Sequence, residues 1–96
     1  QAIERIIRLL LNLCKQYGVS VPGGCCIDIH FTHSDVASMV NTSRVTVSNI
    51  FTWLAENGYL HRQERFFVVD SVERLEELAQ EGIDLEQYMK KQKKGS

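Results

Sequence analysis

Several features that would assign this 96-residue sequence to a membrane or secreted class are missing. Its apolar runs, such as Leu9–Leu11, are far shorter than the ~20 residues that a membrane-spanning helix needs. There is no secretory signal pattern, and the cysteines are odd in number (three), which indicates reduced thiols rather than a disulfide framework. The sequence therefore predicts a soluble, cytoplasmic protein without membrane association.

The sequence also offers little for catalysis or metal binding. No cysteine, serine or acidic residue stands beside a plausible base, and no phosphate-binding loop is present. Cys25, Cys26, His30 and His33 match no common zinc spacing, and strand alternation points the two cysteines to opposite faces. Cys14 falls on the apolar stripe of a helix, as an inert core thiol would. We expect no enzyme, and no cofactor or metal in this domain.

The chain also has no large excess of positive or negative charge. Residues 1–71 carry six basic and six acidic side chains, and the whole chain has a net charge of −1. Binding to phosphate needs local positive charge rather than a basic total. Arg44, Arg62 and Arg65 can form only a small basic patch, so we expect weak nucleic-acid binding by this chain alone.

The first third of the chain predicts a helix, a turn and a strand. Apolar residues recur at three- and four-residue steps over residues 1–17, namely Ile3, Ile6, Ile7, Leu10, Leu11, Cys14 and Tyr17. Gly18 follows as a helix-ending glycine, and 21–24 form a turn. Residues 26–31 alternate strictly, which predicts a half-buried strand with Ile27, Ile29 and Phe31 on one side.

Residues 32–58 predict two helices joined by a tight turn. The Thr32 hydroxyl can cap a helix of about two turns, and Ser43 can cap a long one over residues 44–57, which Gly58 closes. Ala37 is small where the two helices would touch, and Asn41 tolerates the left-handed backbone of the turn. An apolar lock is supplied by Val36, Val40, Val47 and Ile50. This spacing is typical of a helix-turn-helix.

The remainder predicts a hairpin, a helix and a tail. Residues 59–62 and 66–69 are strand-like, with a glycine-free turn of undetermined type between them. A last helix begins near Ser71, buries Val72, Leu75, Leu78 and Ala79, and ends at Gly82. The fold class is thus α+β: a winged helix-turn-helix over residues 1–82, with a three-helix core, a small hairpin wing and a C-terminal helix. Residues 83–96 form a weakly helical to disordered basic tail.

The long helix divides into an apolar stripe and an outward face that is small, mostly polar and free of acid, which suits a DNA groove. Asn49 could pair with adenine, Ser48 with several bases, and Val45 with a thymine methyl group. Arg62 and Arg65 on the hairpin could reach phosphates, while Trp53 is expected to pack inside rather than stack on a base. The candidate DNA-binding residues are Thr32, Arg44, Val45, Thr46, Ser48, Asn49, Thr52, Arg62 and Arg65.

Residues 4–70 resemble the C-terminal domain of the Crp/Fnr family of bacterial transcription regulators. The resemblance is carried by residues 5–15, by 29–37, by the recognition-helix segment 43–50 and by Gly58-Tyr59-Leu60. It implies sequence-specific binding of double-stranded DNA, with helix 44–57 in the major groove and hairpin 60–69 on the backbone. It further implies a homodimer on a palindromic operator, RNA polymerase as a further partner, and effector-sensing and dimerisation parts outside this chain. The helical pattern begins at Gln1 itself, as expected of a fragment of a longer protein.

Two positions depart from the family pattern. Val45 stands where glutamate is usual and Asn49 where arginine is usual, so we expect a changed base preference rather than loss of binding. A winged-helix module for protein interaction, without specific DNA binding, remains the alternative. It is favoured by the neutral charge and by these two residues, and it predicts no salt-dependent affinity for DNA.

Overall fold

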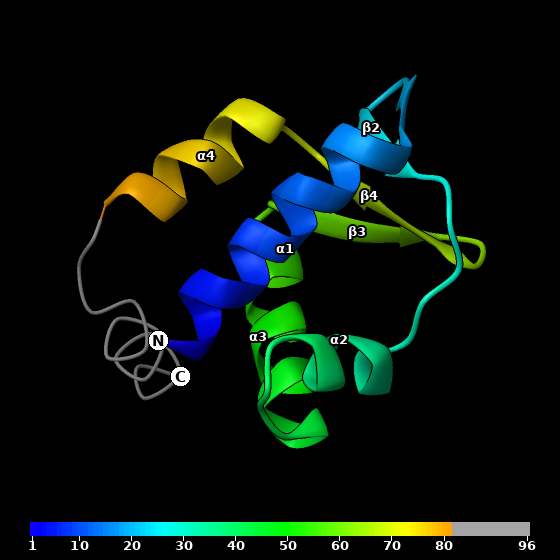
Figure 1. Cartoon of the computed structure of the whole chain (residues 1–96). Helices are drawn as coiled ribbons and strands as arrows, with labels where there is room; N and C mark the ends of the chain where they lie inside the picture. The colour runs from blue at the N-terminus through cyan, green and yellow to red at the C-terminus, as the bar shows by residue number, and fades with distance from the viewer. Residues whose placement is uncertain (82–96) are drawn as a thin grey trace.

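The computed structural model describes residues 1–81, which form four helices and one antiparallel sheet (Figure 1). In chain order these are α1 (Ala2–Tyr17), β1 (Gly18–Val21), β2 (Gly24–Ile27), α2 (His33–Met39), α3 (Arg44–Glu56), β3 (Leu60–Gln63), β4 (Phe66–Val69) and α4 (Val72–Gln80). The α+β winged helix-turn-helix predicted from the sequence is confirmed. The predicted domain boundary at Gly82 and the tail 83–96 lie outside the described residues.

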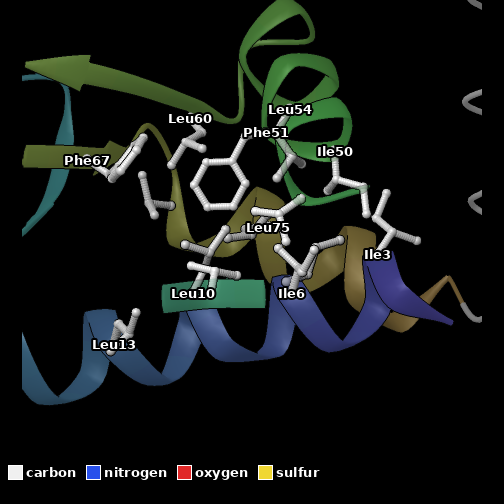
Figure 2. Close-up of a cluster of buried hydrophobic side chains, with 14 of the residues drawn as sticks. Ile3, Ile6, Leu10, Leu13, Ile50, Phe51, Leu54, Leu60, Phe67 and Leu75 are labelled. Carbon is white, nitrogen blue, oxygen red and sulfur yellow. The ribbon is translucent and has the colours of Figure 1, made fainter. Parts of the chain in front are cut away.

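Helix α1 crosses the middle of the molecule, with α4 on one side and α3 on the other (Figure 1). Its buried face packs with α3, α4 and the sheet into one core, in which Phe51, Leu60 and Phe67 lie together (Figure 2). The periodicity placed most of this face correctly. It was wrong for Tyr17, which is exposed, and it missed Leu13, which is buried. Tyr17 is the last helical residue, beyond the reach of the core.

The sheet is larger than the sequence indicated. Its strand order is β1-β2-β4-β3, so the wing hairpin β3–β4 continues through β4 into a second hairpin, β1–β2. Strand β1 was not predicted, because this edge strand is mostly exposed and carries no burial signal. The turn predicted at 21–24 is confirmed, since Pro22 and Gly23 lie between the paired residues Val21 and Gly24, and this turn is the signal from which a strand before it could have been inferred.

The strand predicted over 26–31 was placed too late in the chain. Its ladder with β4 ends at the pair Ile27 and Phe67, and the next backbone N–H, that of Asp28, donates to the Tyr17 carbonyl. Phe31 is nevertheless buried, with its ring centroid 5.1 Å from that of Phe67. The alternating pattern therefore reported burial correctly but not strand hydrogen bonding.

Gly18 follows α1 as predicted but not for the predicted reason. Its φ of −74° is open to any residue. A Cβ atom there would lie 2.2 Å from the Cys14 carbonyl oxygen and 2.4 Å from Cys25 Sγ. The glycine is therefore required by the close approach of β2 to the end of α1.

The helix-turn-helix agrees with the prediction. Asn41 has a φ of 57° and Gly58 a φ of 77°, so both adopt the left-handed backbone that the turn and the helix end require. Burial confirms the apolar lock, formed by Val36, Val40, Val47 and Ile50. Within the described part of the chain, no helix has the length and apolarity needed to cross a membrane.

Candidate nucleic-acid interface

Helices α2 and α3 form one end of the molecule (Figure 1), and α3 carries exposed side chains there. Val45, Asn49 and Thr52 are exposed, and Val45 reaches 68% exposure although it is apolar. The opposite stripe, which includes Val47 and Phe51, is buried in the core. The fold thus leaves a face of small polar and apolar side chains without a partner in the described residues.

The start of α3 is fixed by a side-chain cap. Ser43 Oγ accepts a hydrogen bond from the Thr46 backbone N–H at 3.1 Å and donates to Thr46 Oγ1 at 2.9 Å. Thr46 is therefore part of the cap and only half-exposed, while Arg44 at the first helical position is exposed. Exposed arginine at a capped helix N-terminus places positive charge beside free backbone N–H groups, an arrangement that favours phosphate.

Thr32 caps α2 as predicted. Its hydroxyl accepts from the Asp35 backbone N–H at 3.1 Å, and its own N–H donates to Asp35 Oδ2 at 2.8 Å. The two bonds form a reciprocal capping box that fixes where α2 begins. Thr32 itself is exposed.

Ser48 does not project freely from α3. Its hydroxyl shares a hydrogen bond of 2.9 Å with Nδ1 of His33 on α2. The His33 ring packs against Phe51, with centroids 4.8 Å apart, and stacks on Phe67 at 6.1 Å. Sequence reasoning weighed His33 only as a metal ligand and missed this role. In the described part of the chain, no three His, Cys, Asp or Glu side chains are grouped to hold a metal ion.

The wing places a second arginine, Arg62, against the Phe67 ring that also contacts His33. The guanidinium of Arg62 on β3 lies over the Phe67 ring, 5.2 Å from its centroid. Burial, then the charge of Arg44 and then that of Arg62, lower the pKa of His33 below its usual range. Both arginines therefore lie within electrostatic reach of one histidine. Arg65 is exposed in the turn between β3 and β4.

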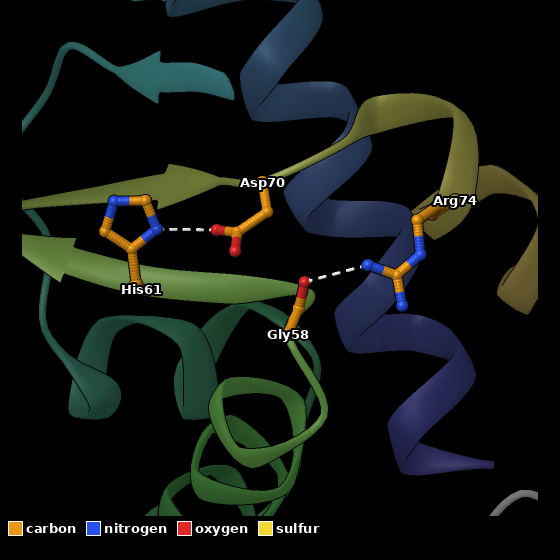
Figure 3. Close-up of polar contacts among 4 residues, drawn as sticks. All are labelled: Gly58, His61, Asp70 and Arg74. Carbon is orange, nitrogen blue, oxygen red and sulfur yellow. Dashed lines mark hydrogen bonds and ion pairs between the residues drawn. The ribbon is translucent and has the colours of Figure 1, made fainter. Parts of the chain in front are cut away.

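The far end of α3 is held by aromatic and cationic contacts. Trp53 is buried and stacks on Tyr59, with centroids 6.0 Å apart, which confirms that it packs inside. The guanidinium of Arg74 on α4 lies over the Tyr59 ring, 4.6 Å from its centroid. Arg74 also donates a hydrogen bond to the Gly58 carbonyl oxygen at 3.1 Å (Figure 3). His61 Nδ1 donates to Asp70 Oδ1 at 2.6 Å across the wing (Figure 3).

The family model for the Crp-like helix-turn-helix domain matches residues 4–78 of the chain. The chain belongs to this family. The family model, with relatives named as a transcription factor and as an HTH-type transcriptional regulator, assigns this Crp-like domain to DNA binding in transcription regulation.

Solved structures share this fold. The Crp-like domain is similar to the CO-dependent transcription factor CooA from Carboxydothermus hydrogenoformans, with a TM-score of 0.76, 25% identity, and coverage of 82% of this chain and 37% of that one. It is also similar to reduced CprK without ligand, with a TM-score of 0.74, 26% identity, and coverage of 81% and 38%.

Curated relatives match over part of their length. The global nitrogen regulator of Synechocystis sp. is 34% identical over 57 residues, which cover 59% of this chain and 25% of the relative. That of Nostoc sp. is 35% identical over 53 residues, covering 55% and 24%. The Crp-like domain thus spans about a quarter of the length of these relatives.

Proposed function

We propose that this domain binds double-stranded DNA sequence-specifically, with α3 in the major groove and the β3–β4 wing against the phosphate backbone. The observation that carries the proposal is the exposed face of α3, which Arg44 begins, together with Arg62 of the wing over the Phe67 ring. A recognition surface needs cations at its edges and small side chains of mixed character at its centre. This end of the molecule supplies both.

Each side chain then has a role set by its position. Arg44, at the N-terminus of α3, binds a phosphate together with free backbone N–H groups. Asn49 pairs with an adenine edge, and the exposed Val45 packs against a thymine methyl group. Arg62 and Arg65 bind the backbone from the wing.

The parts of the protein outside this chain complete the proposal. A homodimer reads a palindromic operator in the cytoplasm, an effector acts through a separate domain, and RNA polymerase is a further partner. This domain takes part by binding rather than by catalysis and needs no cofactor of its own. The dimer would place two α3 helices one turn of DNA apart, about 34 Å.

Selection from a random duplex library, followed by binding of the best duplex at several salt concentrations, tests the proposal. We expect an enriched consensus and an affinity that falls steeply with salt, because bound cations release counterions. Arg62→Ala should reduce the slope of the logarithm of affinity against that of salt by about 1.

Lys15→Ala is the matched control, because Lys15 is exposed on α1 beside α4, away from this surface. It should leave the salt slope unchanged. If the library yields no enriched sequence, the domain is instead a protein-interaction module and the proposal is wrong.

A further inference from the structure

The hydrogen bond between His33 and Ser48 lies within the proposed reading surface. Ser48 is on α3, between the exposed positions Val45 and Asn49, and is half-exposed itself. Its hydroxyl is 2.9 Å from His33 Nδ1. Any base that meets Ser48 therefore meets a hydroxyl that already has one protein partner.

Packing positions the ring that provides this partner. His33 packs against Phe51 of α3 and Phe67 of β4, at centroid distances of 4.8 and 6.1 Å, and these two rings contact each other at 5.1 Å. The two aromatic neighbours support one side of the imidazole, while Nδ1 faces Ser48 Oγ at 2.9 Å.

The proton on Nδ1 decides what Ser48 can offer. A serine hydroxyl has one proton to donate and two lone pairs to accept with. If Nδ1 is unprotonated, the Ser48 hydroxyl donates its hydrogen bond to the ring and can only accept a hydrogen bond from a base. If Nδ1 carries a proton, Ser48 accepts from the ring, and its own proton is free for a base.

We propose that His33 is a specificity-determining residue that sets Ser48 as an acceptor while its ring is neutral and as a donor once its ring is protonated. This rests on the DNA binding proposed above. As an acceptor, Ser48 favours the amino groups of adenine or cytosine; as a donor, it favours guanine or the O4 atom of thymine. The domain then reads one base pair differently in neutral and in mildly acidic solution.

The charges around His33 set where this change occurs. Arg44 of α3 and Arg62 of β3 both disfavour a protonated ring, and β4 contributes the apolar Phe67. On α2 itself, the Asp35 carboxylate accepts from the Thr32 N–H. Burial and the two arginines lower the pKa of His33, which favours the neutral ring. DNA phosphates bound at Arg44 and Arg62 would offset their charge and raise this pKa in the complex.

The test uses the full chain and a random duplex library, selected at pH 7.5 and at pH 5.5. The best duplex at pH 7.5 is then measured with each of the four base pairs at every position. We expect the preference at one base pair to shift by about 5- to 100-fold between the two pH values. Ser48→Ala should abolish that shift and leave the preference set by Asn49 intact.

His33→Phe keeps an aromatic ring packed against Phe51 and Phe67 and removes the nitrogen, so it should also abolish the shift. His30→Gln is the matched control, because His30 is exposed three residues away and should leave the shift unchanged. Urea unfolding of each variant checks that it is folded. If His33→Phe does not fold, Ser48→Ala still tests the inference.

A measurement without DNA completes the design. Long-range proton–nitrogen NMR spectra of the free chain report the neutral tautomer of His33, and we expect a bare Nδ1 at pH 7.5. A proton on Nδ1 at that pH, or a consensus unchanged at pH 5.5, overturns this inference and leaves the proposed function standing. Failure to enrich any duplex at either pH overturns both.

Discussion

Arg5 and Val40 join the first helix to the end of the helix-turn-helix. Arg5 Nε donates a hydrogen bond to the Val40 carbonyl oxygen at 3.1 Å, across 35 residues of sequence. Val40 is the residue that ends α2, where carbonyl groups lack partners within the helix. A cation at that point satisfies a carbonyl and also opposes the negative end of the helix dipole. The orientation of α2 is thereby tied to α1.

Arg5→Met should therefore destabilise the fold. Methionine keeps most of the apolar stem but removes the donor, and a part-buried hydrogen bond to a charged group contributes about 1–2 kcal/mol. The free energy of unfolding in urea measures the loss. Arg8→Met is the control, since Arg8 makes an exposed pair with Glu4 one turn away, which contributes under about 0.5 kcal/mol. Equal losses for the two variants would contradict the role given to Arg5.

Arg44→Ala and Asn49→Ala should affect DNA binding in different ways. Arg44 is placed to bind phosphate, so its loss should weaken binding to all duplexes by a similar factor. Asn49 is placed to bind a base, so its loss should relax the preference at one base pair, by about 1–3 kcal/mol. Comparing the affinity of each variant for the best duplex and for a scrambled one checks this. An unchanged consensus after Asn49→Ala would show that Asn49 does not contribute to base recognition.

Gly18→Ala should cost at least about 2 kcal/mol of stability, because the new methyl group would overlap the Cys14 carbonyl and Cys25 Sγ. Gly58→Ala is the comparison. A Cβ there would meet nothing closer than Arg74 Nη1 at 3.8 Å, and only the φ of 77° opposes it, which costs about 1 kcal/mol. Thermal or urea unfolding ranks the two. A smaller effect at Gly18 would show that β2 can move away from α1.

The sequence could predict what depends on local spacing. Helix caps at Thr32 and Ser43 and the left-handed Asn41 are encoded within a few residues, and all three are confirmed. It could not predict the bond between His33 and Ser48, because those residues are 15 apart and meet only through the crossing angle of α2 and α3. Strand β1 was missed for a related reason, as pairing rather than burial forms it.

His33 should also make stability depend on pH. Its pKa is lowered in the folded state, so below the usual value of about 6.5 the unfolded chain binds a proton that the folded chain resists. Stability should therefore fall as pH drops through that value and level off below the folded pKa. Urea unfolding of the wild type between pH 7.5 and 5 measures this. His33→Phe should remove that part of the slope, whereas a slope that persisted would assign it to other groups.

Glu64 stores backbone strain at the tip of the wing. Its φ is 57°, and Asn41 is the other non-glycine residue with positive φ in the described part of the chain. Glu64 and Arg65 form the two-residue turn that joins the paired residues Gln63 and Phe66, and tight hairpin turns favour glycine at such a position.

Glu64→Gly should relieve the strain, and we expect a gain of up to about 1 kcal/mol, since the greater freedom of the unfolded chain offsets part of it. Arg65→Gly is the matched control: with no positive φ to relieve, it should lower stability by about 0.5–1 kcal/mol. Urea unfolding of both variants measures the difference. If Glu64→Gly were the more destabilising of the two, the left-handed backbone at residue 64 would be wrong. The position of Arg65 on the wing would then have to be revised with it.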